Sequence, residues 1–542
     1  MKKIILALLI MVMILSNTAI IGGCSDDSED IDPNRTQLYV GVFEGGYGTD
    51  WLYKFKELYE AKNPSAQIMI RPKKNEYTSN ALLNTISIKT KGSPDLYFAP
   101  INYYDFASSG KLLDVTDTVN EKLTEYGEDR SIVEKMDDDM LKYYSSYSND
   151  EGESQIMAIP WGSSVYSINY DVDLFEEKGL FFDKDGNFTT GLPDAQPKSD
   201  GQDSIAGTYD DGLPITYSDF NLLLEEMSYM NNIKPFVWSN IAGYRQGFLT
   251  SVFASYEGSY NFNLNKNMNG EYMFSGDSEP TQISVNNAYL LQKQTGKKVA
   301  LEFAKNIINN NYYHESSFEP TNDFMAAQSA FLLSKTKAAN GTDKRIAFLI
   351  DGGHWYNEAK SVIELYGAKN RRFGLMPFPK FPGSPATKAT YYNSSSTQAV
   401  FIRSNPEQEE LARDFLKFTS SEDMIRLMTR MSGIIRQFDY TMTPDDYKEM
   451  PYYYQTVAEA FTSDKVDVVS MLSGEPIIYE NAQFFAFNNT WQWIGKAGAV
   501  ALNEPFETFA KNPSLTAEEY FIGMQNTYNK NYWEAGFSKY FD

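Results

Sequence analysis

The residue types that carry most enzyme chemistry are scarce in this sequence. Its 542 residues include two histidines, His314 and His354, and a single cysteine, Cys24. A serine-type triad needs a histidine beside its nucleophile, and structural zinc sites take most of their ligands from Cys and His. No G-x-S-x-G, H-E-x-x-H or P-loop sequence occurs in the chain. The sequence therefore predicts no histidine-based active site, no metal site and no bound cofactor.

Three other patterns could carry chemistry. The "GGYG" loop at residues 45–48 lies where a dinucleotide fingerprint would lie, but it lacks the G-x-G-x-x-G spacing, so we reject it. "DKDGN" at residues 183–187 is similar to a calcium loop, but its glycine comes too early and no closing glutamate follows, which favours a hairpin turn. With 72 Asp and Glu residues, a carboxylate pair for glycoside hydrolysis stays an open alternative.

The single cysteine stands between an apolar segment and an acidic one. Two lysines, an apolar run over residues 4–15 and a pair of glycines precede Cys24, which is the order of a secretory signal. The apolar run is shorter than the roughly 20 residues that a transmembrane anchor needs. "IGGC" resembles the lipobox of bacterial lipoproteins, whose cysteine receives two acyl chains, enough for stable anchoring. We predict a signal peptide over residues 1–23 and an acylated acidic tether over residues 24–36; a chance cysteine near a cleavage site is the alternative.

Composition bounds the remaining possibilities. The formal net charge of −24 argues against a nucleic-acid partner, because such proteins cluster Lys and Arg to displace counterions. No second apolar segment reaches membrane-spanning length, so we expect contact with the membrane through the lipid anchor alone, at the outer face of the cytoplasmic membrane. Aromatic residues make up 15% of the chain, enough to build a core and to leave rings for stacking on a ligand. A chain of this length is too long for one core, so we predict two or more lobes.

Hydrophobic patterning predicts an α/β fold. Buried strands are expected at residues 38–43, 67–70 and 95–98, with helices over residues 51–59 and 77–90 between them. This order implies a parallel sheet with helices on both faces, in which ligands bind at the carboxyl ends of the strands. Further strands are expected at residues 157–161, 165–170, 345–350, 373–376 and 399–402, and helices at residues 217–230, 406–418 and 421–432, with mostly helical sequence from Asp445 onward. Residues 181–214 are rich in Gly, Asp and Pro, which indicates an insertion of turns and hairpins.

Capping residues indicate where three of these helices begin or end. Thr216 with Asp219 resembles a capping box, and Asn405 precedes a proline in the first turn of a helix. Gly433 follows a helical pattern and is expected to end it.

Five separated segments carry a resemblance to a known family. In order along the chain they read "GSPDLYFAP", "AIPWGSSVYSINYDVDLFEEKGL", "LIDGGHWYNEA", "FGLMPFPKFPG" and "NPEQEELARDFLKFTSSEDMIRLMTRMSG". Together with the lipobox, this ordered set resembles the family 1 extracellular solute-binding proteins of ABC importers, the group that includes maltodextrin-binding protein. The resemblance implies a two-lobed periplasmic-binding-protein-like α/β fold, with doubly wound sheets, hinge crossovers and a ligand cleft between the lobes. Lobe 1 would comprise residues 37–160 and 393–436, and lobe 2 residues 161–392 and 437–542, with crossovers near residues 161–164, near residues 391–393 and after Arg436.

The resemblance also implies which side chains hold the solute. Sugar rings stack on aromatic side chains and their hydroxyl groups need planar polar partners, so a sugar cleft mixes Trp and Tyr with Asn, Asp, Glu and Arg. Matched onto the family pattern, the expected ligand-binding residues are Glu44, Tyr47, Asn102, Tyr103, Trp161, Tyr244, Arg245, Trp355 and Trp491. Each of them has packing in the core as its alternative, and Trp491 competes with Trp493 because residues two apart cannot share a helical face.

The resemblance implies a binding function without chemistry. The expected protein is a lipid-anchored, extracellular or periplasmic monomer that captures a neutral oligosaccharide and delivers it to the transmembrane permease subunits of an ABC importer. Two alternatives from other classes stay open: a lipid-anchored glycoside hydrolase that uses a carboxylate pair, and an extracellular sensor subunit that reports the solute to a kinase. The sequence does not name the sugar, its linkage or its length.

Overall fold

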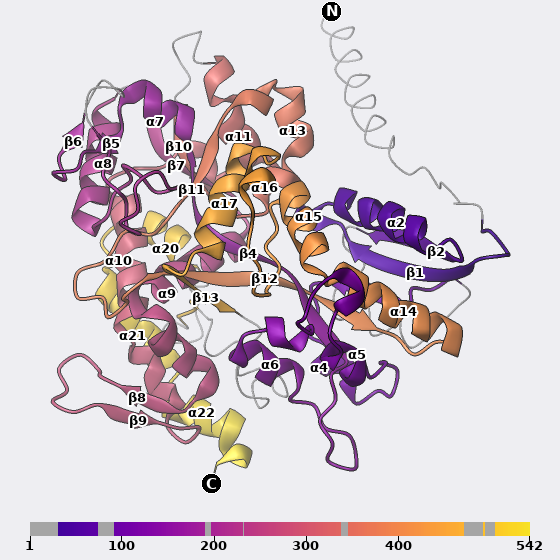
Figure 1. Cartoon of the computed structure of the whole chain (residues 1–542). Coiled ribbons are helices and arrows are strands. Elements are labelled where there is room, and N and C mark those ends of the chain that lie inside the picture. Colours follow the sequence, from indigo (N-terminus) through magenta and orange to yellow (C-terminus); the bar gives the residue numbers. More distant parts are fainter. Residues whose placement is uncertain are drawn as a thin grey trace, which may run out of the picture.

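The computed structural model of the chain describes residues 31–73, 92–189, 197–230, 232–337, 345–470, 491–493 and 504–541. It confirms the α/β class. A nine-stranded mixed sheet runs through the molecule in the order β2-β1-β3-β12-β4-β10-β7, with β11 paired to β4 and β13 paired to β12, and helices pack around it (Figure 1). The predicted helix over residues 77–90, the signal peptide and Cys24 lie outside the described residues.

Strands and helices follow one another in mixed order along the chain. The strands of the large sheet are β1 (Thr36–Phe43), β2 (Ala66–Lys73), β3 (Leu96–Ala99), β4 (Ala158–Asp171), β7 (Ile233–Trp238), β10 (Arg345–Gly352), β11 (Phe373–Met376), β12 (Ala389–Phe401) and β13 (Val466–Ser470). Two small hairpins pair β5 (Phe181–Phe182) with β6 (Phe188–Thr189) and β8 (Gly270–Tyr272) with β9 (Thr281–Ile283). Within the described residues, the α-helices are α2 (Asp50–Lys62), α4 (Tyr104–Ala107), α5 (Thr116–Asn120), α6 (Asp138–Tyr144), α7 (Val172–Lys178), α8 (Tyr217–Tyr229), α9 (Ala242–Asn267), α10 (Thr295–Asn309), α11 (Phe324–Lys337), α12 (Trp355–Glu358), α13 (Lys360–Leu365), α14 (Pro406–Thr419), α15 (Glu422–Ser432), α16 (Pro444–Lys448), α17 (Tyr452–Thr462), α20 (Pro505–Lys511), α21 (Ala517–Thr527) and α22 (Lys530–Phe537). Short 3-10 helices, among them η1 (Gly45–Tyr47) and η5 (Glu315–Phe318), connect several of these elements.

The amino-terminal end of the sheet confirms the predicted order of strands. β1 pairs in parallel with β2 on one side and with β3 on the other. α2 buries a stripe of four side chains at helical spacing: Trp51, Leu52, Phe55 and Tyr59. This stripe packs against aromatic rings of α14. Asn405 caps α14, because its side-chain oxygen accepts a backbone N–H of the first turn, so the predicted cap is confirmed.

Two long strands, β4 and β12, join the two ends of the sheet. β12 pairs antiparallel with β3 through residues 398–401 and with β4 through residues 393–400. β4 continues beyond this contact and pairs antiparallel with β10 through residues 166–170. The two strands predicted on either side of Gly162 are one 14-residue strand, because the small residues between them continue the pairing with β12. Two of the predicted crossovers therefore fall inside continuous strands, and the lobe boundaries stay a prediction.

The other end of the sheet is covered by α8 and α9. There β10 lies between β4, to which it is antiparallel, and β7, to which it is parallel. α8 begins at the predicted capping box of Thr216 and Asp219, which is confirmed. α9 kinks at Gly258, where φ is 72° and an added Cβ atom would lie 3.1 Å from Cα of Ala386. Only glycine suits both the left-handed backbone and the close approach.

The region after Asp445 departs in part from the prediction. The sequence predicts mostly helix, and α16, α17, α20, α21 and α22 agree with it. Among the residues described in this region, β13 is the exception, because its valines favour extended backbone and pair in parallel with β12. Among the described residues, none of the helices combines the length and the apolar character that crossing a bilayer requires.

The predicted hairpin at residues 183–187 is confirmed. This segment joins β5 to β6. The carboxylate of Asp183 accepts the backbone N–H groups of Asp185 at 2.9 Å and of Asn187 at 2.8 Å. Its oxygens therefore serve the turn itself.

Candidate functional site

Aromatic rings from three separate segments surround His354, which follows β10. Tyr47 in η1 stacks on the imidazole with ring centroids 6.3 Å apart, and Tyr166 on β4 meets it edge-on at the same separation. Tyr244 at the start of α9 lies 6.4 Å from the imidazole and stacks in turn on Phe324. We call His354, Tyr47, Tyr166 and Tyr244 the His354 centre. Tyr47 belongs to predicted lobe 1 and Tyr244 to predicted lobe 2, so the structure brings two of the predicted ligand-binding residues together between the predicted lobes.

The backbone around the His354 centre is rich in glycine for a steric reason. A Cβ atom on Gly46 would lie 2.5 Å from Cδ2 of His354, and one on Gly352 would lie 2.2 Å from its Cε1. Carbon atoms in contact lie about 3.5–4.0 Å apart, so neither position accepts a side chain while the imidazole stays in place. Sequence reasoning missed His354 as a site residue. The signal in the sequence that could have indicated His354 is a pair of glycine turns, Gly45–Gly46 after β1 and Gly352–Gly353 at the end of β10.

His354 is held in its neutral form. Its Nδ1 lies 3.0 Å from Oγ of Ser164 on β4, and its backbone N–H donates to the same oxygen at 3.0 Å. Nε2 lies 3.9 Å from the nearest carboxylate oxygen of Asp351. Burial lowers the pKa of His354 to about 4, because the imidazolium form loses its solvation. Because Ser164 engages Nδ1, the neutral imidazole offers a ligand its Nε2 atom, as a donor or an acceptor according to the tautomer.

Two carboxyl groups lie beside the imidazole. Asp351 is near the end of β10 and Glu358 is the last residue of α12. The side-chain amide nitrogen of Gln328 on α11 donates to both, at 3.1 Å and 2.6 Å. Burial and then the charge of Glu358 raise the pKa of Asp351 well above its usual value, and burial raises the pKa of Glu358 to about 7. A protonated form of Glu358 is therefore accessible near neutral pH.

The His354 centre offers ring faces and hydrogen-bonding groups. Burial, and then the carboxyl groups of Asp351 and Glu358, raise the pKa of Tyr166 and of Tyr244 far above the usual value, so both hydroxyl groups keep their protons. Both tyrosine side chains are partly exposed. Ring faces next to phenol, imidazole and carboxyl groups are the combination that holds a polyhydroxylated ligand.

Trp355 lies in the core instead of at the His354 centre. Its side chain is completely buried, and its ring meets Phe331, Phe373 and Tyr453 at centroid distances of 5.5, 5.2 and 5.4 Å. The turn after β10 directs His354 toward the tyrosines, and the next residue begins α12 and faces inward. This placement favours the packing role that the sequence left as the alternative, and ligand binding by Trp355 stays a prediction.

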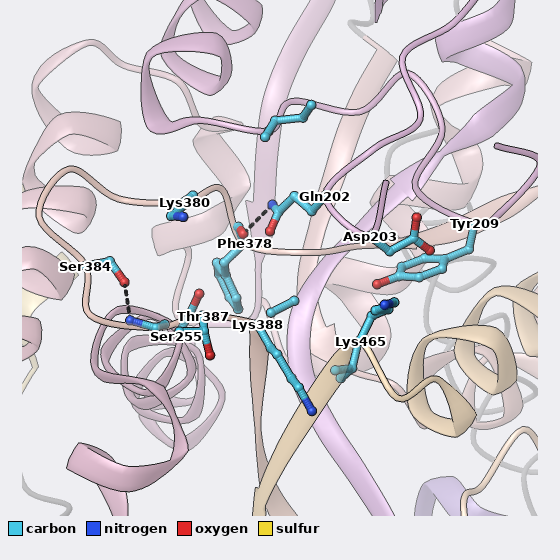
Figure 2. Close-up of a pocket in the computed structure, with 14 residues that line it drawn as sticks. Gln202, Asp203, Tyr209, Ser255, Phe378, Lys380, Ser384, Thr387, Lys388 and Lys465 are labelled. Atoms are coloured by element: carbon cyan, nitrogen blue, oxygen red, sulfur yellow. Dashed lines mark hydrogen bonds between the residues drawn. The ribbon is translucent and has the colours of Figure 1, made fainter. Parts of the chain in front are cut away.

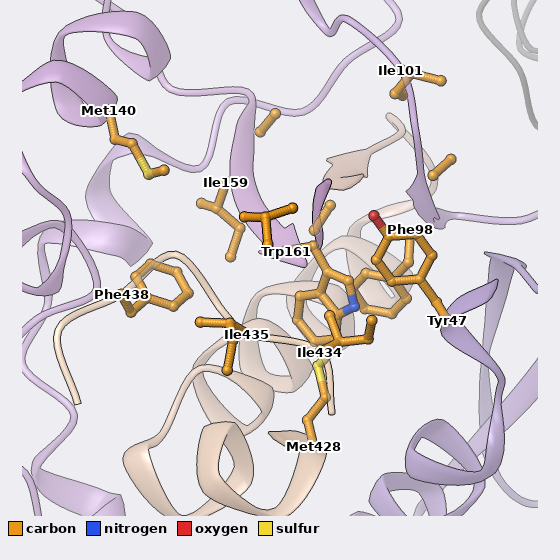
Figure 3. Close-up of a cluster of buried hydrophobic side chains, with 14 of the residues drawn as sticks. Tyr47, Phe98, Ile101, Met140, Ile159, Trp161, Met428, Ile434, Ile435 and Phe438 are labelled. Carbon is orange, nitrogen blue, oxygen red and sulfur yellow. The ribbon is translucent and has the colours of Figure 1, made fainter. Parts of the chain in front are cut away.

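Trp161 lies in a cluster of buried apolar side chains that also contains Tyr47 (Figure 3). It stacks on Phe98 with ring centroids 3.9 Å apart, and the guanidinium group of Arg436 lies 3.8 Å from its ring. Only 1% of Trp161 is exposed, so its ring lies in the core in this conformation. Stacking of Trp161 on a ligand stays a prediction.

Trp491 and Arg245 are also buried. The indole N–H of Trp491 donates to Oγ1 of Thr250 at 3.0 Å, and Arg245 forms an ion pair with Glu504 at 3.1 Å. Trp493 is half-buried. Trp491 and Arg245 therefore each have a structural partner. Whether Trp491 or Trp493 faces a ligand stays open.

The remaining predicted residues lie at the carboxyl ends of β1 and β3. Glu44 follows β1 and is partly exposed. Asn102 and Tyr103 follow β3; the hydroxyl group of Tyr143 donates to Oδ1 of Asn102 at 2.8 Å, and the hydroxyl group of Tyr103 donates to the carbonyl of Tyr143 at 3.0 Å. Tyr103 is fully buried. Their ligand contacts stay predictions.

Among the hollows formed by the described residues, two that lie outside the His354 centre touch the predicted insertion or a predicted crossover. The larger has a volume of about 930 Å³ and is lined by residues 134–140 and 435–440, by α9 and by β13. Seven carboxylates and two buried cations, Lys135 and Arg436, lie in its wall. The smaller, of about 330 Å³, is shown in Figure 2. The predicted insertion contributes to its wall, together with three lysines: Gln202, Asp203, Tyr209, Lys380, Lys388 and Lys465.

Comparison with known proteins identifies the fold. No protein-family model matches the chain, and no curated protein matches it in sequence. Maltose-bound MalE3 of T. maritima is similar with a TM-score of 0.52 and 14% identity, over 91% of this chain and 99% of that one. SBP RafE in complex with raffinose gives a TM-score of 0.52 and 14% identity over 92% and 99% of the two chains, and the apo-form of RafE from Streptococcus pneumoniae gives 0.54 and 12% over the same shares. The fold is the two-lobed periplasmic-binding-protein type, which confirms the predicted fold class and, at the level of fold, the resemblance.

Proposed function

We propose that the protein is a carbohydrate-binding protein that serves an ABC importer, anchored by lipid at Cys24 to the outer face of the cytoplasmic membrane. The fold supports this proposal, because two proteins of similar fold were solved with a bound sugar, MalE3 with maltose and RafE with raffinose. The observation that carries the proposal for this chain is the convergence of Tyr47 and Tyr244, one from each predicted lobe, on the neutral imidazole of His354.

The chemistry of the His354 centre favours a neutral sugar. The partly exposed rings of Tyr166 and Tyr244 suit the C–H faces of a pyranose, and their hydroxyl groups with His354 suit its hydroxyl rim. In the part of the chain that the structure describes, Asp351 and Glu358 form no ion pair with a lysine or arginine, and the centre consists of Tyr and His, so an anionic solute would find no counter-charge there. A neutral oligosaccharide needs no counter-charge, so its binding avoids the cost of burying an unpaired charge.

Binding would select the closed arrangement of the lobes. Tyr47 is 4% exposed in this conformation, so a sugar at Tyr244 would contact both predicted lobes only after the lobes rearrange around it. This difference in contacts is the differential affinity that a shift in population requires. The closed, liganded monomer would then be the form that the permease subunits recognise, and the protein itself performs no reaction.

The two carboxyl groups allow the hydrolase alternative to be weighed. Glycoside hydrolases place their two carboxyl groups about 5–9.5 Å apart, on opposite sides of the scissile bond. Asp351 and Glu358 instead share the amide nitrogen of Gln328, so no sugar unit fits between them. The arrangement favours binding over hydrolysis. A sensor subunit would use the same site and would differ only in its partner, so loss of a sensor would leave uptake intact.

Isothermal titration with a panel of neutral oligosaccharides tests the proposal. We expect at least one to bind without being shortened, as chromatography of the mixture reports. Tyr244→Ala should weaken that binding at least tenfold, because an aromatic anchor contributes about 2 kcal/mol or more. Tyr229→Ala is the matched control, since Tyr229 on α8 is 68% exposed. Absence of binding across the panel, or equal affinity of Tyr244→Ala and the unmodified protein, would contradict the proposal.

A further inference from the structure

We propose that Asp351, His354, Glu358 and Gln328 bind a divalent transition-metal ion such as Zn²⁺ or Mn²⁺. The proposal goes beyond carbohydrate binding and does not depend on it. It also departs from the sequence analysis, which predicts no metal site because histidine and cysteine are so scarce.

The ligand atoms are close enough for one ion. One atom each from Asp351, His354 and Glu358 lies within 4.8 Å of the others. Ligand atoms arranged tetrahedrally around one ion at 2.0–2.2 Å lie about 3.3–3.6 Å apart, so the most widely separated pair must close by up to about 1.5 Å to complete the site. The three residues come from the end of β10, the turn after it and the end of α12, so one short segment supplies all three.

The imidazole is oriented for coordination. Ser164 lies 3.0 Å from Nδ1 of His354 and also accepts its backbone N–H, which leaves Nε2 on the side of Asp351. A metal-bound histidine usually has its other ring nitrogen held by such a hydrogen bond, which fixes the orientation of the ring.

Gln328 places a fourth polar side chain against the two carboxyl groups. Its side chain is completely buried, and its Oε1 atom has no hydrogen-bond partner, while its amide nitrogen lies on both carboxyl groups. A buried carbonyl oxygen without a partner is unfavourable. Turning the amide over would place Oε1 among the carboxyl oxygens. A cation bonded to those oxygens would make it a fourth ligand.

The local charge also favours a cation. Among the described residues, no lysine or arginine forms an ion pair with Asp351 or Glu358, and Nε2 of the neutral His354 lies 3.9 Å from Asp351. The groups that face the pair from neighbouring elements are uncharged: Tyr166 from β4 and Tyr244 from α9. Two buried carboxylates without a counter-charge are costly, and a divalent ion supplies it. An imidazole among carboxylates favours Zn²⁺ or Mn²⁺ over Ca²⁺ or Mg²⁺.

Metal titration of chelator-treated protein tests this site. We expect one Zn²⁺ or Mn²⁺ per chain by calorimetry, with micromolar or tighter affinity, and a higher midpoint of thermal unfolding when the ion is present. Glu358→Gln should weaken binding at least tenfold, and Ser164→Ala should weaken it with little effect on folding. Glu257→Gln is the matched control, because Glu257 is also buried, with a pKa raised by burial to about 7, but lies among Tyr272 and Gly296 without an imidazole.

Each outcome decides the proposal. Failure of Zn²⁺ and Mn²⁺ to bind, or binding that Glu358→Gln leaves unchanged, would overturn it. Equal losses in Glu358→Gln and Glu257→Gln would overturn it too, since they would report a general effect of a buried Glu→Gln change. Binding of Ca²⁺ or Mg²⁺ alone would overturn the assignment to a transition metal. A sugar titration in excess chelator is scored separately, so failure of the metal site and failure of the carbohydrate proposal are distinguishable.

Discussion

Replacing Gly352 by alanine should displace His354 and weaken both the fold and the site. The new Cβ atom would lie 2.2 Å from Cε1 and 2.5 Å from Nδ1 of the imidazole, more than about 1 Å inside normal contact distance. Gly352 has no left-handed φ, so alanine itself fits the backbone and the strain falls on His354. The ring must turn away from Ser164, which breaks the 3.0 Å contact. Overpacking costs about 1–3 kcal/mol and the lost hydrogen bond about 1 kcal/mol, so the free energy of unfolding should fall by about 2–4 kcal/mol.

Urea unfolding measures this loss, and calorimetry with a bound sugar measures the effect on the site. We expect at least tenfold weaker sugar binding, because the displaced imidazole no longer meets the ligand. Gly353→Ala is the matched control, since the nearest atom to its added Cβ is Oγ of Ser164 at 3.4 Å, an ordinary contact. If the two variants unfold at the same urea concentration and bind sugar equally, the packing of His354 between the glycines is refuted.

Three further predictions concern the anchor, the core and the pH dependence. Cys24→Ala should move the protein from the membrane fraction to the soluble fraction, as an immunoblot after a salt wash reports; a variant that stays with the membranes would refute the lipid anchor. Trp355→Ala should lower the free energy of unfolding by about 3–5 kcal/mol in urea denaturation, because its ring is completely buried, and a loss below about 1 kcal/mol would show that it is not a core residue. Burial raises the pKa of Asp210 from 3.8 to about 6, so the folded protein keeps a proton that the unfolded chain releases. The contribution of Asp210 to stability should therefore fall by about 3 kcal/mol as the pH rises from about 4 to 6, and Asp210→Asn should remove it; an unchanged pH profile of that variant would contradict the buried position.

Local signals in the sequence predicted the ends of several elements correctly. Thr216 with Asp219, Asn405 and Gly433 act where the sequence places them, and Gly433 has the left-handed φ of 67° that a helix C-cap favours. These features depend on hydrogen bonds that span only a few residues. They therefore need no knowledge of the rest of the fold.

The candidate site could be predicted only in part. Tyr47 and Tyr244 follow from the family resemblance, but the side chain that they meet, His354, was not among the predicted residues. Whether His354 or Trp355 faces the tyrosines depends on the backbone direction in the turn after β10, which the spacing of residues does not encode. The contact of Trp161 with Arg436 joins residues far apart in the chain, and single-sequence patterns carry no information about such pairs.

The histidine signals of the protein test the central claim most directly, because there are only two histidines. His314 bonds Ser316 in η5 and takes no part in the His354 centre, and His354→Gln assigns the remaining resonances. In protein labelled with nitrogen-15 in histidine alone, titration with an oligosaccharide that binds by calorimetry should shift the imidazole resonances of His354 and leave those of His314 unchanged. A sugar that binds with full occupancy and leaves the His354 resonances where they were would contradict the proposed site.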